Sequence, residues 1–291
     1  MVIIVKRYPP KGNLQLFRYD SNTPFECWRC QETKVSKLQA VVTLKKPHII
    51  CNACYGYLLS LAEIKAQDIE PWQKADQIHD LTITQVSERV AASAVEKQEQ
   101  KHKQYWKFTS REAKRFIGTA EFLYERMLDH DDLDFSGPII ELIKAFEHEC
   151  VSRFVEPMRA VASRTNLLEC EIQKDCQDDD FGHMAKYVFG HGAKPPELGR
   201  ISHALDVFIH SKKRIQDSRF LKILDDQISL CHDRDYFINK ERFVAQVNQL
   251  TQSYRNPAAH IGSMSKKDYE ECEAMLMNDN GALWQLITAI R

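Results

Sequence analysis

Two short cysteine pairs constrain this chain more than any other feature of its sequence. Cys27 and Cys30 form one C-x-x-C pair and Cys51 and Cys54 form a second, with twenty residues between the pairs. Four thiolates at such paired spacing can surround one zinc ion as a tetrahedron. Because all four coordination positions are then filled, we expect a structural zinc site and no catalytic metal.

The residues around these pairs indicate a small β-rich module. Short β segments are predicted at 2–5, 14–19 and 37–44, separated by turn-forming proline, glycine and asparagine. The second pair leads directly into an apolar helical pattern, which predicts a treble-clef-like module over residues 1–70: a knuckle, a hairpin, and a second knuckle that opens a helix. The segment PHIICNACYGYLLSL resembles the second half of a GATA-type zinc finger. That resemblance implies the zinc geometry, not DNA recognition.

Two roles for this module stay open. The zinc ion could simply hold together a region too small to build its own core, because its binding free energy is then folding free energy. Alternatively, the module docks to nucleic acid or to a protein, such as the ATPase of a larger machine. We favour the structural role. A second metal site from Cys170, Cys176, His183 and His191 is not expected, because their spacings of five to seven intervening residues fit no recurrent site.

Composition and charge narrow the class of protein. A length of 291 residues and a hydrophobic fraction of 43% suffice for one large domain or two modest ones. The net charge of -1 gives no global attraction to nucleic acid, so any such contact needs a local patch. No apolar run is long enough to cross a bilayer, and the initial MVIIV precedes Lys6 and Arg7, the reverse of a signal peptide's order. We therefore expect a cytoplasmic protein with no membrane partner.

The rest of the chain has helical periodicity. The sequence thus predicts a mainly α protein in three parts: the zinc-binding module at 1–70, a helical linker or arm at 71–108, and an α-helical bundle at 109–291. Residues 96–115 hold seven Lys or Arg against three Glu. The candidate RNA contacts in and near this stretch are Lys101, Lys103, Lys107 and Lys114. A solvated helix face is the interpretation that we favour for it.

Several local signals shape the predicted bundle. Apolar residues recur on one face from Ile139 to Met158, after a proline suited to a first helical turn, and predict a core helix. Residues 165–198 are irregular and long for a loop, which indicates a functional or mobile segment. Ser265 and Asp268 form an S-x-x-D capping box that begins the last helix, and an interruption is expected near Gly281.

The string YRNPAAHIG carries the candidate chemistry. Since the residue before a proline avoids the α region, Asn256 is expected to end one helix and Pro257 to open the next turn. His260 would then lie in a first helical turn, where the dipole favours a neutral imidazole that can act as a base. Arg255 offers a fixed, fork-shaped cation for a phosphate.

An Arg followed by Asn, with a His a few residues later, resembles the signature of HEPN domains. YRNPAAHIGSMSKKDYEE reproduces that form with its downstream capped helix. GTAEFLYERMLDHDDLDFSGPIIELIKAFEHE (118–149) resembles the segment that opens many such domains, and PELGRISHAL (196–205) resembles the lead into the next helix. The resemblance spans about residues 110–291 and has its three parts in the right order.

This resemblance implies an α-helical bundle that dimerises so that the motifs of two protomers share one cleft. It implies His260 as general acid or base, Arg255 as stabiliser of the transition state, and Asn256 as an orienting hydrogen-bonding group. Glu147 is a candidate for orienting the Arg or the His across the bundle; an exposed or helix-pairing glutamate is an equally good interpretation.

The implied function is a metal-independent endoribonuclease, acting as a toxin or an anti-phage abortive-infection effector held in check by a regulatory partner. The ribose 2′-hydroxyl would attack the adjacent phosphorus, which leaves a 2′,3′-cyclic phosphate and makes DNA inert. The alternative is an inactive HEPN-like module that binds RNA or protein as an adaptor or regulator. A third interpretation is that Arg255 and His260 only close a helix–helix turn.

Overall fold

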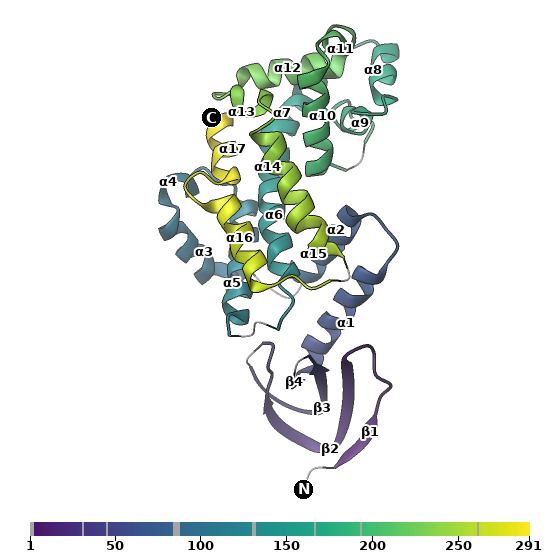
Figure 1. Ribbon diagram of the computed structural model, residues 1–291, viewed down its shortest axis with the longest axis vertical. Helices are drawn as coiled ribbons and strands as arrows, with labels where there is room; N and C mark the ends of the chain where they lie inside the picture. The colour runs from purple at the N-terminus through teal and green to yellow at the C-terminus, as the bar shows by residue number, and fades with distance from the viewer. Residues whose placement is uncertain are drawn as a thin grey trace.

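A small antiparallel sheet lies at one end of the molecule, and helices form the rest (Figure 1). The computed structural model describes residues 3–30, 32–44, 46–83, 88–129, 132–165, 167–192, 194–260 and 262–291; for residues 83 and 88–92 it describes the backbone alone. This architecture confirms the predicted fold class, mainly α with an N-terminal β module.

The sheet has the strand order β1-β2-β3-β4, with every neighbouring pair antiparallel. Its strands are β1 (Ile4–Arg7), β2 (Leu14–Glu26), β3 (Thr33–Thr43) and β4 (Pro47–Ile50). The sequence did not predict β4, and β2 is longer than predicted because it continues through Pro24. That proline lies opposite Val35 of β3, in a part of β2 that β1 does not pair with. A residue without an N–H is tolerated where one side of the strand is unpaired.

Helix α1 (Asn52–Ala66) leads from the sheet to the helical part, and α2 (Pro71–Ile83) follows it (Figure 1). Next come α3 (Glu88–Lys101), α4 (Lys103–Trp106) and α5 (Arg111–Met127). Buried residues of these helices belong to the same core cluster as the bundle, among them Leu61, Ile78 and Trp106. Residues 71–83 and 88–108 therefore pack against the bundle. Residues 84–87, which belong to the predicted helical arm at 71–108, lie outside the described residues.

Two long helices of the bundle each contain a π turn. The first consists of α6 (Ser136–Cys150), η1 (Val151–Val155) and α7 (Glu156–Ala162). The second consists of α14 (Phe243–Leu250), η2 (Thr251–Arg255) and α15 (Asn256–Ala259). In both, a proline follows the π turn at the second position, Pro157 and Pro257. A proline cannot donate to the preceding turn and its ring crowds a carbonyl there, so a locally widened turn lets the helix continue.

The second π turn corrects one expectation. Asn256 was predicted to end a helix, yet its backbone is helical, with φ −66° and ψ −48°, and the helix continues to Ala259. His260 consequently follows the end of α15 and does not lie in the first turn of a new helix. The dipole argument for a neutral imidazole therefore no longer applies.

Of the remaining helices, those between residues 169 and 238 lie at the end of the bundle away from the sheet, and the last two pack against α6 (Figure 1). These remaining helices are α8 (Glu169–Cys176), α9 (Gly182–Val188), α10 (Leu198–His210), α11 (Lys212–Asp217), α12 (Arg219–Leu230), α13 (Asp235–Ile238), α16 (Lys266–Met277) and α17 (Ala282–Ile290). The segment 165–198, predicted as an irregular loop, contains α8 and α9. The capping box of Ser265 and Asp268 is present at the start of α16, and Gly281 directly precedes α17, as predicted.

Replacement of Gly281 by alanine is expected to lower the free energy of unfolding by about 1–3 kcal/mol. A Cβ there would collide with the backbone of Leu276 and Met277, which cannot move aside cheaply. Gly56→Ala is the matched control, because a Cβ at this position in α1 meets nothing within 4 Å. It should raise the same free energy by about 0.5–1 kcal/mol. Urea unfolding of both variants measures the difference, and equal effects would contradict the packing argument.

Candidate functional site

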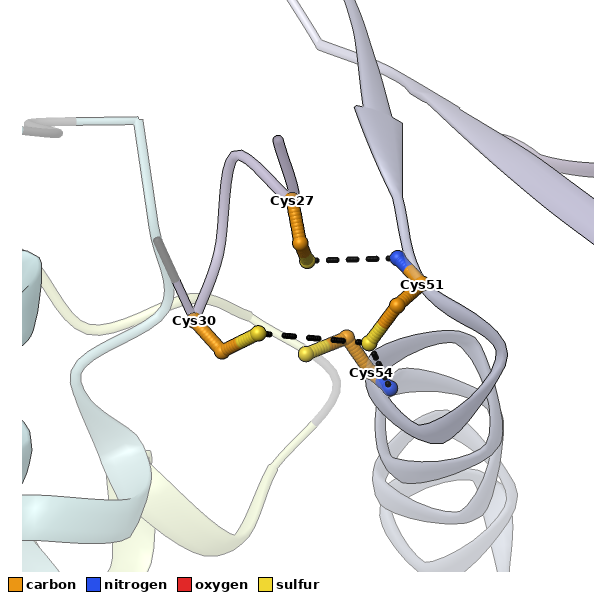
Figure 2. A group of neighbouring side chains, drawn as sticks. All are labelled: Cys27, Cys30, Cys51 and Cys54. Atoms are coloured by element: carbon orange, nitrogen blue, oxygen red, sulfur yellow. Dashed lines mark hydrogen bonds between the residues drawn. The ribbon is translucent and has the colours of Figure 1, made fainter. Parts of the chain in front are cut away.

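Four cysteines come together where the sheet meets α1, as Figure 2 shows. Cys27 and Cys30 lie in the turn between β2 and β3, and Cys51 and Cys54 lie at the junction of β4 and α1. Their sulfur atoms all lie within 4.8 Å of one another, and all four are free thiols. The sequence prediction of one four-cysteine cluster is confirmed, and the cluster is close enough to bind a metal ion.

Backbone amides already point at the sulfur atoms. The N–H of Cys51 donates to Cys27 Sγ at 3.2 Å, and the N–H of Cys54 donates to Cys51 Sγ at 3.5 Å, which caps α1. Hydrogen bonds with the thiols of Cys51 and Cys54 lower the pKa of Cys27, whereas hydrogen bonds with Cys27 and Cys51 raise the pKa of Cys54. The Cys27 thiol therefore loses its proton more readily than the Cys54 thiol, and a bound cation would favour the thiolate form of its ligands.

The cysteine cluster is attached to the helical bundle. The Arg29 guanidinium lies 3.9 Å from the ring centroid of Tyr57 on α1 and donates to Cys54 Sγ at 3.7 Å. From α5, Arg126 Nη1 donates to the backbone carbonyl of Cys30 at 2.7 Å. Arg29 thus joins the first cysteine pair to α1, and Arg126 joins it to a helix of the bundle.

One metal ion per chain is the expected stoichiometry of the purified protein. Cys30→Ser should lower this content and the melting temperature, because a missing thiolate opens the coordination shell. Cys170→Ser, which changes an exposed cysteine outside the cluster, is the control. Elemental analysis measures the metal content, and thermal unfolding measures the melting temperature. A metal content unchanged in Cys30→Ser would show that this cluster is not the metal site.

The second candidate site centres on a buried ion pair between two of the predicted residues. Arg255 Nη2 lies 3.3 Å from Glu147 Oε1, and the two residues are 3% and 8% exposed. Arg255 comes from the π turn η2 and Glu147 from α6. The structure thus brings Arg255 and Glu147 together across the bundle.

Glu147 has further partners that fix its carboxylate. Oε2 accepts from Lys144 Nζ at 2.8 Å, and Oε1 also accepts from the backbone N–H of Leu198, at the start of α10, at 3.2 Å. Lys144 also pairs with Asp76 of α2. Burial alone would raise the pKa of Glu147, but the charges of Lys144 and Arg255 outweigh burial and lower it. Glu147 is therefore a fixed anion.

Two clefts lie on either side of this ion pair. Arg255 and Asn256 line one of about 360 Å³, together with Trp72, Arg200 and His203. Glu147 lines a second cleft, of about 450 Å³. Trp72 and Glu197 border both clefts, which are therefore adjacent.

The second cleft holds an oriented imidazole. His79 Nδ1 lies 2.8 Å from Oε1 of Glu141, a fully buried carboxylate whose Oε2 has no hydrogen-bond partner among the described residues. Burial raises the pKa of Glu141. This pair orients the ring that lines the cleft.

His260 lies apart from these groups. It is exposed, its N–H donates to the carbonyl of Pro257 at 3.0 Å, and its ring does not line the cleft of Arg255. Within one protomer the structure therefore does not bring His260 and Arg255 into one cleft, although Asn256 does border that cleft.

The four candidate RNA-binding lysines lie elsewhere. Helices α3 and α4 lie on the opposite side of the bundle from α2 (Figure 1). Lys101 pairs with Glu273 at 2.7 Å, and Lys103 and Lys107 share a shallow depression with two glutamates. Lys114 lies over the ring of Trp106. None of the four lines the cleft beside Arg255.

Sequence reasoning missed several residues around the ion pair. Lys144 had a usable signal, because it precedes Glu147 by three residues on one helix. Trp72, Arg200 and His203 had none, since they come from helices that only the tertiary fold brings together. Within the described ranges, Cys170, Cys176, His183 and His191 are not among the residues gathered into a candidate metal cluster.

Comparison of the chain with protein-family models, with curated proteins and with solved structures found no match. The resemblance to HEPN domains accordingly depends on the sequence motifs alone. Over the part of the chain that is described, no helix has the length and apolar character needed to span a membrane.

Glu147→Gln is expected to lower the free energy of unfolding at pH 7 by about 3–5 kcal/mol, because Arg255 and Lys144 lose a buried counter-charge. Since the pKa of Glu147 is lowered on folding, its stabilising contribution is complete above the unfolded value of about 4.3. That contribution is lost as the pH falls further, through the folded value. The difference in the free energy of unfolding between the variant and the wild type should therefore become smaller below about pH 4.

The control for this variant is Glu271→Gln, which removes one partner of an exposed pair with Lys267. It should change the free energy of unfolding by less than about 1 kcal/mol. Chemical denaturation over a pH series measures both variants. A gap for Glu147→Gln that stays constant down to about pH 2 would contradict an ionised Glu147.

Proposed function

We propose that this protein is a metal-independent endoribonuclease of the HEPN type, with Arg255 and His260 as its catalytic residues. The observation that carries this proposal is the buried Glu147–Arg255 pair, which fixes the guanidinium at the wall of an open cleft. Asn256 borders the same cleft, and the exposed His260 lies at the end of the same helix.

Arg255 would bind the scissile phosphate. Among the described residues, Nη2 is the one guanidinium nitrogen with a hydrogen-bond partner, so the other N–H groups would be available to a ligand in the cleft. A preorganised cation stabilises the charge that develops at phosphorus in the transition state without reorganisation. Arg200 and His203, each about half exposed, border the same cleft and would attract the flanking phosphates.

His260 would transfer protons, and the site would then be complete only in a homodimer. Its ring lies outside the cleft of its own Arg255, so a partner's His260 would have to enter that cleft across a two-fold axis. The same operation would place this protomer's His260 in the partner's cleft. An exposed imidazole that directly follows α15, the helix whose Asn256 borders the cleft, suits such an exchange.

The reaction is a transesterification. An imidazole takes the proton of the ribose 2′-hydroxyl while the 2′-oxygen forms a bond to phosphorus. The bond from phosphorus to the 5′-oxygen breaks, and that oxygen takes up a proton from the protonated imidazole. The products are a 2′,3′-cyclic phosphate and a free 5′-hydroxyl. No metal takes part in the reaction. The role we propose for this enzyme is that of a toxin or defence effector controlled by a regulatory partner.

The four-cysteine cluster would hold zinc in a structural role. Four thiolates suit a tetrahedral, soft-ligand metal and leave no open coordination position. The sheet supports this role, because the buried apolar residues around the cluster are few, among them Leu14, Val42 and Ile50. A bound metal would therefore supply folding free energy that this small core lacks.

An RNA-binding module without activity is the second candidate. The position of His260 outside the cleft favours it, because a binder needs Arg255, Arg200 and Trp72 but no imidazole in reach. Such a protein would bind RNA with an affinity that falls as salt is raised, and would cut no strand.

Cleavage of single-stranded RNA in the presence of EDTA tests the proposal. Arg255→Ala with His260→Ala should reduce the rate by at least about 100-fold, because both the phosphate contact and the proton transfer are lost. The products should carry a 2′,3′-cyclic phosphate, and an oligonucleotide with 2′-deoxyribose throughout should stay intact.

Lys267→Ala, an exposed change on α16, is the control for the double variant. The metal content of the EDTA-treated protein is measured in parallel, so that loss of fold and loss of chemistry are separated. Binding without scission by the wild type would favour the second candidate. Cleavage by the double variant at the wild-type rate would remove Arg255 and His260 from the mechanism.

A further inference from the structure

A lysine of the N-terminal module is buried at the junction with the bundle. Lys65 is the penultimate residue of α1, the helix that begins at the cysteine cluster, and it is only 5% exposed. A buried ammonium is costly unless it is paired and hydrogen-bonded. Its contacts therefore indicate what this position does.

Lys65 Nζ has three oxygen acceptors. It donates to Asp134 Oδ2 at 2.6 Å, to Ser136 Oγ at 2.9 Å, and to the carbonyl of Gly262 at 2.9 Å. The first two belong to the segment that enters α6, whereas Gly262 lies two residues after His260. All three donor positions of the ammonium are used, so Lys65 joins the end of α1 to two other chain segments at once.

The stretch after His260 has further attachments to the same segment. The N–H of Met264 donates to Asp134 Oδ1 at 3.0 Å, and the N–H of Phe135 donates to the carbonyl of Met264 at 3.0 Å. On the other side, the N–H of His260 donates to Pro257. The backbone is thus held before and after His260, while its side chain faces solvent.

We infer that Lys65 is a positioning residue: it fixes the loop that carries His260, and it makes the position of this histidine depend on the metal-binding module. This inference rests on the proposed function for its catalytic consequence. The linkage itself follows from the contacts above.

The connection to the cysteine cluster runs along one helix. Cys51 caps α1 and Cys54 lies in its first turn, so the cluster fixes the start of the helix whose end carries Lys65. Lys65 follows Cys54 by eleven positions, which corresponds to about 16 Å of α-helix. The ammonium of Lys74 also donates to the carbonyl of Lys65 at 3.0 Å and ties the end of α1 to α2. Metal loss that frees the start of α1 should consequently loosen the loop after His260.

Amide hydrogen exchange of the full-length protein, with RNA cleavage measured on the same samples, tests this inference. In Lys65→Met, the Met264 amide should exchange at least about tenfold faster, since one charge-assisted hydrogen bond to the loop is lost. Removal of the metal with a chelator should accelerate the same amide in the wild type. The kcat for RNA should fall roughly 10- to 100-fold with little change in KM, because binding to Arg255 persists while the imidazole is misplaced.

Two further variants distinguish loss of the lysine contact from a general loss of fold. Lys65→Met with Asp134→Asn leaves no unpaired buried charge and keeps an amide oxygen at position 134 that can accept from the Met264 N–H. Fast exchange of this amide in the double variant would therefore report the absent lysine contact. Exchange at the wild-type rate in this double variant would overturn the inference. Lys11→Ala breaks an exposed pair with Glu63 on the same module and should change neither readout.

The two proposals fail in different ways. If the wild type cuts no RNA, the proposed function is lost, and exchange alone still decides whether Lys65 holds the loop. If exchange at Met264 is unchanged both in Lys65→Met and after metal removal, the inference is overturned whatever the activity. An unchanged kcat in Lys65→Met, with an active wild type, overturns it as well.

Discussion

The arrangement of the bundle depends on the hydrogen bonds and ion pairs of the Glu147 carboxylate. It accepts hydrogen bonds from Arg255 on the second long helix, from Lys144 on its own helix, and from the N–H of Leu198 at the start of α10. A buried carboxylate needs such partners, because an uncompensated charge in the interior is strongly destabilising. One anion thus sets the relative positions of three elements and, with them, the cleft beside Arg255.

A second constraint acts at the other end of the molecule. The sheet surrounds a small apolar cluster that includes the cysteines, whereas the buried cluster of the helices extends from α1 to α17. Helix α1 belongs to both regions, since Cys54 lies at its start and Leu61 in the large core. The β module is therefore not a separate appendage but is continuous with the bundle through a helix, and Arg126 adds a second connection from α5.

The parts of this structure that local chemistry determines could be predicted from sequence. The pair Ser265 and Asp268 predicted the start of α16 because the two residues bond to each other within one helical turn. The cysteine cluster was predicted from the C-x-x-C spacing of its two pairs, although twenty residues separate them. The surroundings of Arg255 could not be predicted in this way. Three other helices contribute Trp72, His203 and Glu147, and no local sequence pattern predicts which helices become neighbours.

The two prolines within the long helices show a second limit of prediction from sequence. The apolar pattern continued past Pro157, and there the core helix was correctly predicted to reach Met158. At Pro257 the preference of the preceding residue for extended backbone was given more weight, and the helix was wrongly ended at Asn256. In both places a π turn relieves the conflict. Tertiary packing overrides the local preference, which is why Arg255 faces inward from a continuous helix.

The π turns also leave a numerical trace in the sequence. Among the many buried residues of the first long helix, one series lies four positions apart, at Phe146, Cys150, Phe154, Met158 and Ala162. On an uninterrupted α-helix each such step would drift by about 40° around the axis, or about 160° over the whole series. One wide turn absorbs part of that drift and keeps the series on the core side. A long series of apolar residues spaced four apart does not stay on one face of an α-helix with 3.6 residues per turn. Such a series thus indicates a π turn within the helix.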